Sequence, residues 1–340
     1  MKLRASLLWA HRWVGVALGL LLVVVAVTGG LLVFDRTLTR WQHPDLYPKT
    51  PRTGQAVPIA RSIENLVAGQ PGVRVQGIIL PRHDGDALML FAGPKAIHAD
   101  PQTGEILGAR PRVNPLIRTL IQLHVNLLAG EVGATVVVVA TFGSIALALS
   151  GLWLWWPLKI GWFRRGGDFR RFTFDLHSVA GFYASGSLLV IATTGLTLRY
   201  LHGEHPGPTM SDAPPAPRAE ITADQAVAFA EKALPGARAM SLELPAPNPR
   251  APYRVQLSFP IDGSPAGRSV VFLNKFTGET LAVHSAREGG WLKRYQEMQL
   301  SLHTGAILGP STKGIALLTC VALVLQIASG YVLWWKRKAR

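Results

Sequence analysis

The 340-residue sequence contains a single cysteine, Cys320. One cysteine excludes a disulfide within the chain and any zinc or iron–sulfur site built from several thiolates. The sequence also lacks the G-x-G-x-x-G and G-x-x-x-x-G-K-[ST] patterns, so nothing in it indicates a flavin, nicotinamide or nucleoside-triphosphate site. No nucleophile–base constellation is apparent either. Any chemistry must therefore come from another group of residues.

Charged residues are scarce, at 16% of the chain, whereas apolar residues make up 49%. Four apolar runs, over residues 13–34, 132–156, 179–200 and 314–335, approach or exceed the ~20 residues that a transmembrane helix needs. The first run is too long for the apolar core of a signal peptide, and no A-x-A-like site precedes Arg36. The composition therefore predicts an α-helical membrane protein with four transmembrane helices.

Basic residues outnumber acidic ones by 35 to 20 and gather in three short segments beside the spans. By the positive-inside rule these segments face the cytoplasm, so both termini are predicted to be cytoplasmic. The two long connections, about 35–115 and 201–302, then face outward. This distribution favours lipid headgroups over nucleic acid as partners of the positive charge. The basic residues of these three segments are Lys2, Arg4, Arg12, Lys159, Arg164, Arg165, Arg170, Arg171, Lys336, Arg337, Lys338 and Arg340.

The sequence contains an internal duplication. Shifted by 166 residues, the first span lies on the third, and shifted by 179 residues, the second lies on the fourth. Thr103-Gly104-Glu105 in the first connection matches Thr277-Gly278-Glu279 in the second. Because both copies begin on the same side, the pattern predicts two parallel repeats of span, outer module and span. Matched at the spans are His11 with His177, Thr28-Gly29 with Thr194-Gly195, His124 with His303, and Ser150-Gly151 with Ser329-Gly330.

A histidine recurs at the head of each of the four helical units. Equivalent positions of a parallel repeat lie at one depth, so we expect His11 and His177 to meet on the cytoplasmic side and His124 and His303 on the outer side. An ionisable side chain at membrane depth is a functional hypothesis by default. Two imidazoles without a third ligand suit the axial positions of a haem better than a tetrahedral zinc site. The alternatives are another metal and purely structural interfacial histidines.

Other residues fit a haem interpretation. Gly15 and Gly181 follow their histidines by one turn and would let a flat macrocycle approach the backbone. The Thr-Gly and Ser-Gly pairs of the repeat are interpreted as close-packing contacts between helices. Four arginines could meet haem propionates, namely Arg12, Arg118, Arg199 and Arg294.

The distance from His124 to Trp155 is a geometric difficulty. These 31 residues would span about 46 Å in a straight helix, more than the hydrocarbon core. Gly and Pro between histidine and span predict a break, with residues 115–129 as a separate helix capped by Asn114. If that helix folds inward, the outer site comes close enough to the inner one for electron transfer. If it does not, the two sites are too far apart to be coupled directly.

The outer connections are predicted to be small α+β modules. In the second, a helix capped by Thr222 reaches about Ala233, and strands are expected at Tyr253–Phe259, Ser269–Leu273 and Thr280–His284. The first is a shorter version, from Ile59 through Leu88–Phe91 and Ala96–Ala99 to the turn at Thr103-Gly104. His202-Gly203-Glu204-His205 is either a metal site or an ordinary loop.

These motifs resemble the PepSY-associated transmembrane family of bacterial inner-membrane proteins. The resemblance covers nearly the whole chain. Asn126 stands where the second copy has Gly305, so the two outer half-sites differ. The segments that carry the resemblance are His11-Arg12-Trp13-x-Gly15, Leu123-His124, Asp175-Leu176-His177-x-x-x-Gly181, Leu302-His303-Thr304-Gly305, the Ser-Gly…Trp-Trp endings, Asp100-Pro101-x-Thr103-Gly104-Glu105-Ile106-Leu107, Ile221–Ala226 and Phe276-Thr277-Gly278-Glu279.

The resemblance implies an iron-linked redox role, because members of the family accompany iron-uptake systems and some are implicated in reducing ferric siderophores. It implies two haems b, one held by His11 and His177 and the other by His124 and His303, with no catalytic residue separate from these ligands. The electron donor, cytoplasmic or a quinol, is left open. The alternatives are a non-enzymatic PepSY membrane sensor that binds a peptide or partner, and a haem or metal transporter.

The predicted organisation follows the repeat. Its parts are transmembrane helix 1 (1–35), periplasmic PepSY-like module 1 (36–114), interfacial helix plus transmembrane helix 2 (115–157), a cytoplasmic loop (158–176), transmembrane helix 3 (177–200), periplasmic PepSY-like module 2 (201–290), and interfacial helix plus transmembrane helix 4 with a cytoplasmic tail (291–340).

Overall fold

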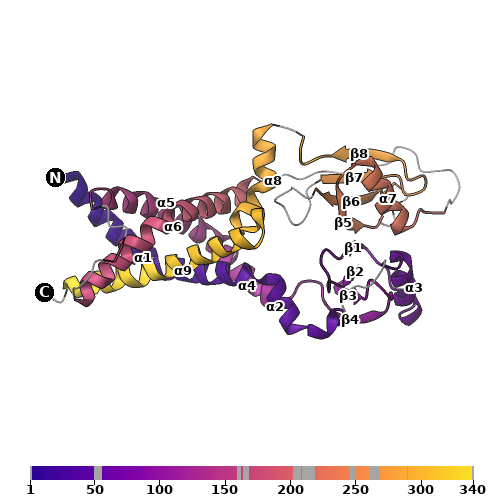
Figure 1. Cartoon of the computed structure of the whole chain (residues 1–340), viewed down its shortest axis with the longest axis horizontal. Helices are drawn as coiled ribbons and strands as arrows, with labels where there is room; N and C mark the ends of the chain where they lie inside the picture. Colours follow the sequence, from indigo (N-terminus) through magenta and orange to yellow (C-terminus); the bar gives the residue numbers. More distant parts are fainter. Residues whose placement is uncertain are drawn as a thin grey trace. The chain divides into compact units, whose positions relative to one another are not determined.

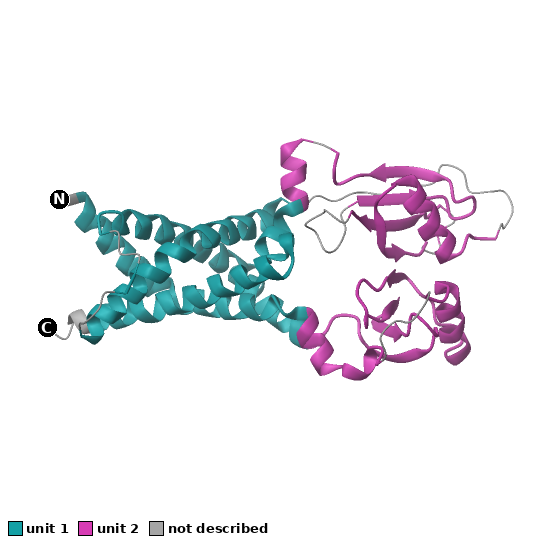
Figure 2. Ribbon diagram, in the orientation of Figure 1, with its two compact units in different colours: residues 1–35, 116–202, 298–340 teal, residues 36–115, 203–297 magenta. Residues whose placement is uncertain are grey.

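The computed structural model divides the chain into two compact units, coloured separately in Figure 2. Unit 1 comprises Met1–Asp35, Leu116–His202 and Met298–Arg340, and unit 2 comprises Arg36–Pro115 and Gly203–Glu297. The structure describes residues 2–49, 56–158, 162–163, 168–201, 208, 219–245, 248, 250–259, 269–288 and 290–338.

Unit 1 is a bundle of four long helices, α1 (Lys2–Leu32), α5 (Gly130–Trp155), α6 (Phe169–Tyr200) and α9 (Pro310–Lys338) (Figure 1). Each is long and apolar enough to cross a membrane, which confirms the four predicted spans. α1 packs against α5 and α9, and α6 packs against the same two helices. α1 and α6 therefore occupy opposite corners of the bundle.

Two of the long helices begin earlier than the apolar runs predict. α1 starts at Lys2 and α6 at Phe169, so α6 occupies part of the loop expected at 158–176. Asp168 caps α6, because its carboxylate accepts a hydrogen bond from the Arg171 N–H at 2.9 Å. As a result, His11 and His177 lie within their helices rather than at the helix heads. Polar residues near the beginning of α1 and α6 lower the hydropathy there, so the apolar runs begin later than the helices do, but these residues are still helical.

Short helices precede α5 and α9, as the Gly and Pro residues predicted. α4 (Pro115–Asn126) comes before α5, and α8 (Trp291–His303) with a 3-10 turn at Ala306–Leu308 comes before α9. The chain reverses between α4 and α5 through positive φ angles at Leu127, Leu128 and Gly130. A Cβ at Gly133 would collide with the backbone oxygen of Asn126, so the first turn of α5 packs closely on the end of α4.

Unit 2 holds one eight-stranded antiparallel sheet in the order β4-β3-β2-β1-β5-β6-β7-β8. The sequence predicts two separate modules, whereas pairing of Gly77–Ile79 in β1 with Ser241–Glu243 in β5 joins their strands. The first half contains α2 (Asp35–Gln42), a 3-10 turn (Pro44–Leu46), α3 (Ile59–Gly69), β1 (Gly77–Ile79), β2 (Leu88–Ala92), β3 (Lys95–Ala99) and β4 (Ile106–Pro111), and the second α7 (Ala223–Ala233), β5 (Arg238–Glu243), β6 (Tyr253–Ser258), β7 (Ser269–Leu273) and β8 (Thr280–His284).

The core of unit 2 lies where α3 and α7 cover apolar side chains of the sheet, including Leu90, Leu242 and Val255. Thr222 caps α7 as predicted, and the structure shows that Gln225 completes a capping box with it. Gly104 and Gly278 take φ angles of 73° and 74°, so the two matched turns have the same backbone conformation. The sequence did not predict the strands β1, β4 and β5.

Candidate functional site

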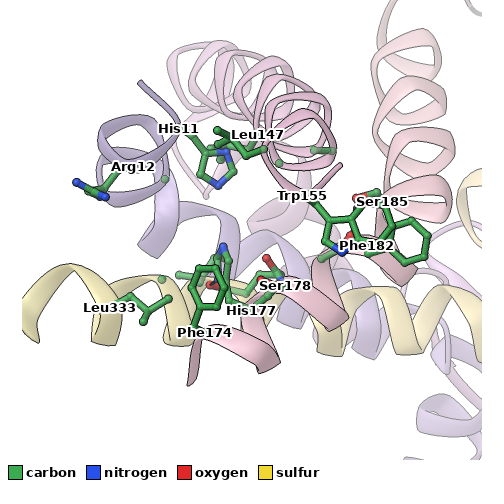
Figure 3. Close-up of a pocket in the computed structure, with 18 of the residues that line it drawn as sticks. His11, Arg12, Leu147, Trp155, Phe174, His177, Ser178, Phe182, Ser185 and Leu333 are labelled. Carbon is green, nitrogen blue, oxygen red and sulfur yellow. Dashed lines mark hydrogen bonds between the residues drawn. The ribbon is translucent and has the colours of Figure 1, made fainter. Parts of the chain in front are cut away.

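His11 and His177 face each other across the middle of the bundle, from α1 and α6 at opposite corners. Their ring centres are 6.3 Å apart and their planes are perpendicular, at 89°. Figure 3 shows His11 pointing toward His177. The structure thus brings together the first of the two pairs that the repeat predicted.

Each ring of this pair is fixed by its Nδ1 atom. His11 Nδ1 lies 2.8 Å from Ser150 Oγ on α5. His177 Nδ1 lies 3.1 Å from the Gln326 carbonyl oxygen and 3.0 Å from Ser329 Oγ on α9. A carbonyl only accepts, so His177 carries its proton on Nδ1 and keeps the Nε2 lone pair for another partner. A hydrogen bond of this kind orients a metal-binding imidazole.

His124 on α4 and His303 on α8 form the second pair, with ring centres 6.0 Å apart and planes at 61°. His124 Nδ1 lies 2.9 Å from the Val25 carbonyl oxygen on α1. His303 Nδ1 lies 2.8 Å from the Ile191 carbonyl oxygen on α6. Both rings therefore donate from Nδ1 to a helix carbonyl and keep Nε2 unprotonated.

All four histidines are held by a hydroxyl residue followed directly by glycine. Ser150-Gly151 holds His11, Ser329-Gly330 holds His177, Thr28-Gly29 holds His124 and Thr194-Gly195 holds His303. A Cβ on these glycines would meet the imidazole Cε1 of their histidines at 3.4, 3.5, 2.8 and 2.9 Å respectively. These dipeptides therefore make close contacts between helices, as interpreted, and the neighbour that each glycine admits is the imidazole of the other helix. The sequence signal that could have linked these dipeptides to the histidines is that both recur at matched positions of the duplication.

The spacing within each pair fits one metal ion between two imidazoles. With a metal–nitrogen bond of about 2 Å on either side, and about 1.1 Å from nitrogen to ring centre, coaxial rings have centres about 6.2 Å apart. Both observed separations, 6.3 and 6.0 Å, agree with this value. Within the described part of the chain no three His, Cys, Asp or Glu side chains gather in a possible metal site. Two imidazoles alone match the axial pair of a haem.

A cavity of about 730 Å³ surrounds the His11–His177 pair. This volume is within the range of about 300–1,000 Å³ typical of small-molecule and cofactor sites. Gly15 and Gly181 line it, as expected for residues that leave room beside the histidines, and so does Trp155, which stacks on Phe182 (Figure 3). The residues present therefore fit a planar macrocycle between the two rings.

The second pair lies between the long helices, because α4 and α8 fold back along the bundle instead of continuing the lines of α5 and α9. His124 contacts Val25, which follows His11 on α1 by 14 residues, or about 21 Å of helical rise. The break between histidine and span left open whether the short helices fold inward, and the structure shows that they do. Both pairs therefore lie along the same bundle, separated by roughly 20 Å.

The predicted arginines differ in their surroundings. Arg199 pairs with Glu131 at the start of α5, and Arg294 donates to the Arg287 carbonyl oxygen at 3.5 Å. Arg12 points away from the two imidazoles in Figure 3, although it borders the cavity. No contact of Arg118 with either pair is seen among the described residues. None of the four is a clear partner for a carboxylate of a bound cofactor.

The histidines outside the repeat have other surroundings. His98 on β3 is fully buried, and its Nε2 accepts a hydrogen bond from Arg110 Nε at 3.2 Å. Burial, reinforced by the positive charge of Arg110, lowers the pKa of His98 to about 4, so it is neutral at pH 7 and tethers β3 to β4. The candidate metal site at His202 and His205 lies outside the described residues.

The comparison with known families gives one match. A family model described as PepSY-associated TM region matches residues 8–337, essentially the whole chain. No match was found among curated proteins. The match includes all four paired histidines and nearly all of the four long helices, so the helices belong to a membrane protein.

Proposed function

Because this chain belongs to the PepSY-associated TM family, and because four of its histidines form two facing pairs, we propose that it is a di-haem b oxidoreductase. It passes electrons across the bacterial inner membrane to a periplasmic acceptor. The acceptor we propose is a ferric siderophore in iron uptake.

The observation that carries the proposal is the construction of the two pairs. In each, the rings are separated as two ligands of one metal ion would be, and every Nδ1 is tied to a helix oxygen. A structural role does not require this arrangement in duplicate. His11 and His177 would hold one haem, and His124 and His303 the other.

When bound, the two haems supply one-electron transfer between the two ends of the bundle. The chain's own residues bind and orient. Ser150, Thr28 and Thr194 fix the ring orientations, while the apolar helix faces exclude water and lower the local dielectric constant, which tunes the reduction potential. Besides these ligands we assign no catalytic residue.

The architecture we propose is two parallel repeats with PepSY-like periplasmic modules. Corresponding contacts support it, since Thr28 meets His124 as Thr194 meets His303, and Ser150 meets His11 as Ser329 meets His177. The basic segments support an orientation with both termini in the cytoplasm. Electrons would then enter near the His11–His177 pair, from a cytoplasmic or quinol donor, and leave near the His124–His303 pair.

The choice of acceptor follows from coordination chemistry together with the family resemblance. Oxygen ligands are hard donors, and hard donors hold Fe(III) far more strongly than Fe(II). One electron delivered to the chelated iron therefore loosens the complex without hydrolysis of any bond.

Haem content and spectroscopy of the protein extracted from membranes test the proposal. We expect two haems b per chain with a reduced-minus-oxidised spectrum of bis-imidazole ligation. His177→Ala should remove one haem and leave the other, and His303→Ala should do the reverse. Reduced protein should then convert a ferric siderophore to the Fe(II) form, trapped by a ferrous chelator.

Two results would contradict the proposal. A preparation without haem, made in cells supplied with haem, would favour a non-enzymatic sensor that binds a peptide or partner. Accumulation of haem or metal inside vesicles without electron transfer would favour a transporter.

A further inference from the structure

Two arginines occupy equivalent places beside the His11–His177 pair. Arg4 on α1 and Arg170 on α6 coincide when the sequence is shifted by 166 residues, the shift that also superposes His11 on His177. Each precedes its histidine by seven residues, which is about two helical turns, so arginine and histidine share a helix face. The rise between them is about 10.5 Å. Both arginines line the cavity that holds the histidines.

The end of this cavity that lies beyond the histidines is strongly basic. Arg4, Arg12, Arg170 and Arg171 border it, against one acidic residue, Asp168. The Asp168 carboxylate accepts the Arg171 N–H as the cap of α6. Arg4 donates from Nη2 to the Leu154 carbonyl oxygen at 3.3 Å, which uses one of its five N–H donors. The cavity thus combines an apolar interior with a cationic end.

We propose that Arg4 and Arg170 bind the two carboxylates at one edge of the macrocycle held between His11 and His177. This assignment rests on the proposed function, because it takes the ligand to be a haem. A porphyrin edge with two carboxylates needs two cationic partners on the same side of the metal. A guanidinium binds a carboxylate with two parallel hydrogen bonds. The repeat supplies one arginine from each of the two ligand-bearing helices.

The second pair lacks this feature. Two turns before His124 and His303 the sequence has Ile117 and Gln296, which are uncharged. The second pair therefore has no arginines at the spacing that Arg4 and Arg170 share. Carboxylate binding by these two arginines also fixes the orientation of the macrocycle at the His11–His177 pair, with its carboxylate edge toward the end of the bundle where α1 begins.

Titration of the full-length protein with haem and with its dimethyl ester tests the assignment. The background is His303→Ala, which leaves only the His11–His177 pair, purified without haem in detergent. We expect haem to bind at least tenfold more tightly than the ester, since the ester cannot form charge-assisted hydrogen bonds with the arginines. Arg4→Gln and Arg170→Gln should each weaken haem binding about tenfold. Neither should change binding of the ester.

Arg199→Gln is the matched control, because it removes the same charge from α6, the helix that carries Arg170, at a side chain that pairs with Glu131 and is not among the residues that line the cavity. It should leave both affinities unchanged. The protein with all four histidines is a second background. There, only the haem at the His11–His177 pair, one of the two expected per chain, should bind more tightly with free carboxylates than as the dimethyl ester.

Equal affinity for haem and ester in both backgrounds would overturn the assignment, and so would variants that lose both ligands to the same extent. In either case a bis-imidazole spectrum would still support the proposed function. Absence of that spectrum from the unsubstituted protein would contradict the proposed function itself.

Discussion

The two histidine pairs have nearly the same geometry but are built in opposite ways. At the His11–His177 pair, the histidines lie on the long helices α1 and α6, and the supporting hydroxyls come from α5 and α9. At the His124–His303 pair, the histidines lie on the short helices α4 and α8, and α1 and α6 provide the support. The same two corner helices thus supply the histidines at one pair and the supporting hydroxyls at the other.

This exchange of roles changes how tightly each imidazole is enclosed. At the second pair the imidazoles approach so closely that a Cβ on Gly29 or Gly195 would lie 2.8 or 2.9 Å from them. At the first pair the corresponding values for Gly151 and Gly330 are 3.4 and 3.5 Å. Rings carried by short helices are pressed against the backbone of α1 and α6. Rings on the long helices instead border a cavity of about 730 Å³.

The largest expected difference between the sites comes from adding one methyl group at the glycines. Gly195→Ala should displace His303 and reduce haem at the second pair at least tenfold, because overpacking costs typically about 1–3 kcal/mol. Gly330→Ala should retain the haem of His177, since its Cβ would make an ordinary contact at 3.5 Å. The outcome is measured as the number of haems bound per chain and as the midpoint potential of each haem in a redox titration. Equal loss in both variants would show that the sites are enclosed alike.

Removal of single hydroxyls should separate the two members of the first pair. Ser150→Ala removes the hydrogen-bond partner found for His11 Nδ1 among the described residues, and we expect about tenfold weaker haem binding. Ser329→Ala should have a smaller effect, because His177 Nδ1 keeps the Gln326 carbonyl. Haem titration of both variants gives the comparison, which fails if Ser329→Ala has the larger effect.

A smaller effect is expected at Gln326, where the repeat is asymmetric. Its side-chain Nε2 donates to the His177 carbonyl oxygen at 2.6 Å, while the equivalent residue of the first copy is Leu147. Gln326→Leu removes this link between α6 and α9 and should lower stability by about 1 kcal/mol, with haem retained. Thermal unfolding in detergent measures it, with Leu147→Gln as the matched control. Complete loss of a haem would instead assign Gln326 to the binding site.

The smallest effect is expected for the exposed ion pair between Glu131 and Arg199. The side chains are 84% and 45% exposed, so their separation should cost less than about 1 kcal/mol. Glu131→Gln and Arg199→Gln should bind two haems with unchanged midpoint potentials. A lost haem in Arg199→Gln alone would restore Arg199 as a carboxylate partner at the second pair.

Much of the site was predictable because it repeats. The 166- and 179-residue shifts matched four histidines in two pairs, and the structure brings the members of each pair together. The hydroxyl–glycine dipeptides were visible in the same alignment and were interpreted as contacts between helices, but their imidazole neighbours were not predicted. Small residues in transmembrane helices have an ordinary explanation in helix packing, and the sequence does not say which neighbour they admit.

The fold of unit 2 was predictable in its local elements and not in its assembly. The Thr222 cap and the turn at Gly104 depend on neighbouring residues, and the structure confirms them, with the same backbone conformation at the matching Gly278. The pairing of β1 with β5 joins residues that are more than 150 positions apart in the sequence, and β1 is only three residues long. So short a strand carries no periodicity that could predict its partner.

The sequence by itself determined the four spans, the short helices and the identity of the paired histidines, because apolar runs, Gly–Pro breaks and repeats are properties of the chain in order. Only the tertiary structure decided that α4 and α8 fold back along the bundle and that each imidazole rests on a hydroxyl and a glycine. Those features depend on contacts of a few ångströms between distant helices. Packing alone sets such distances.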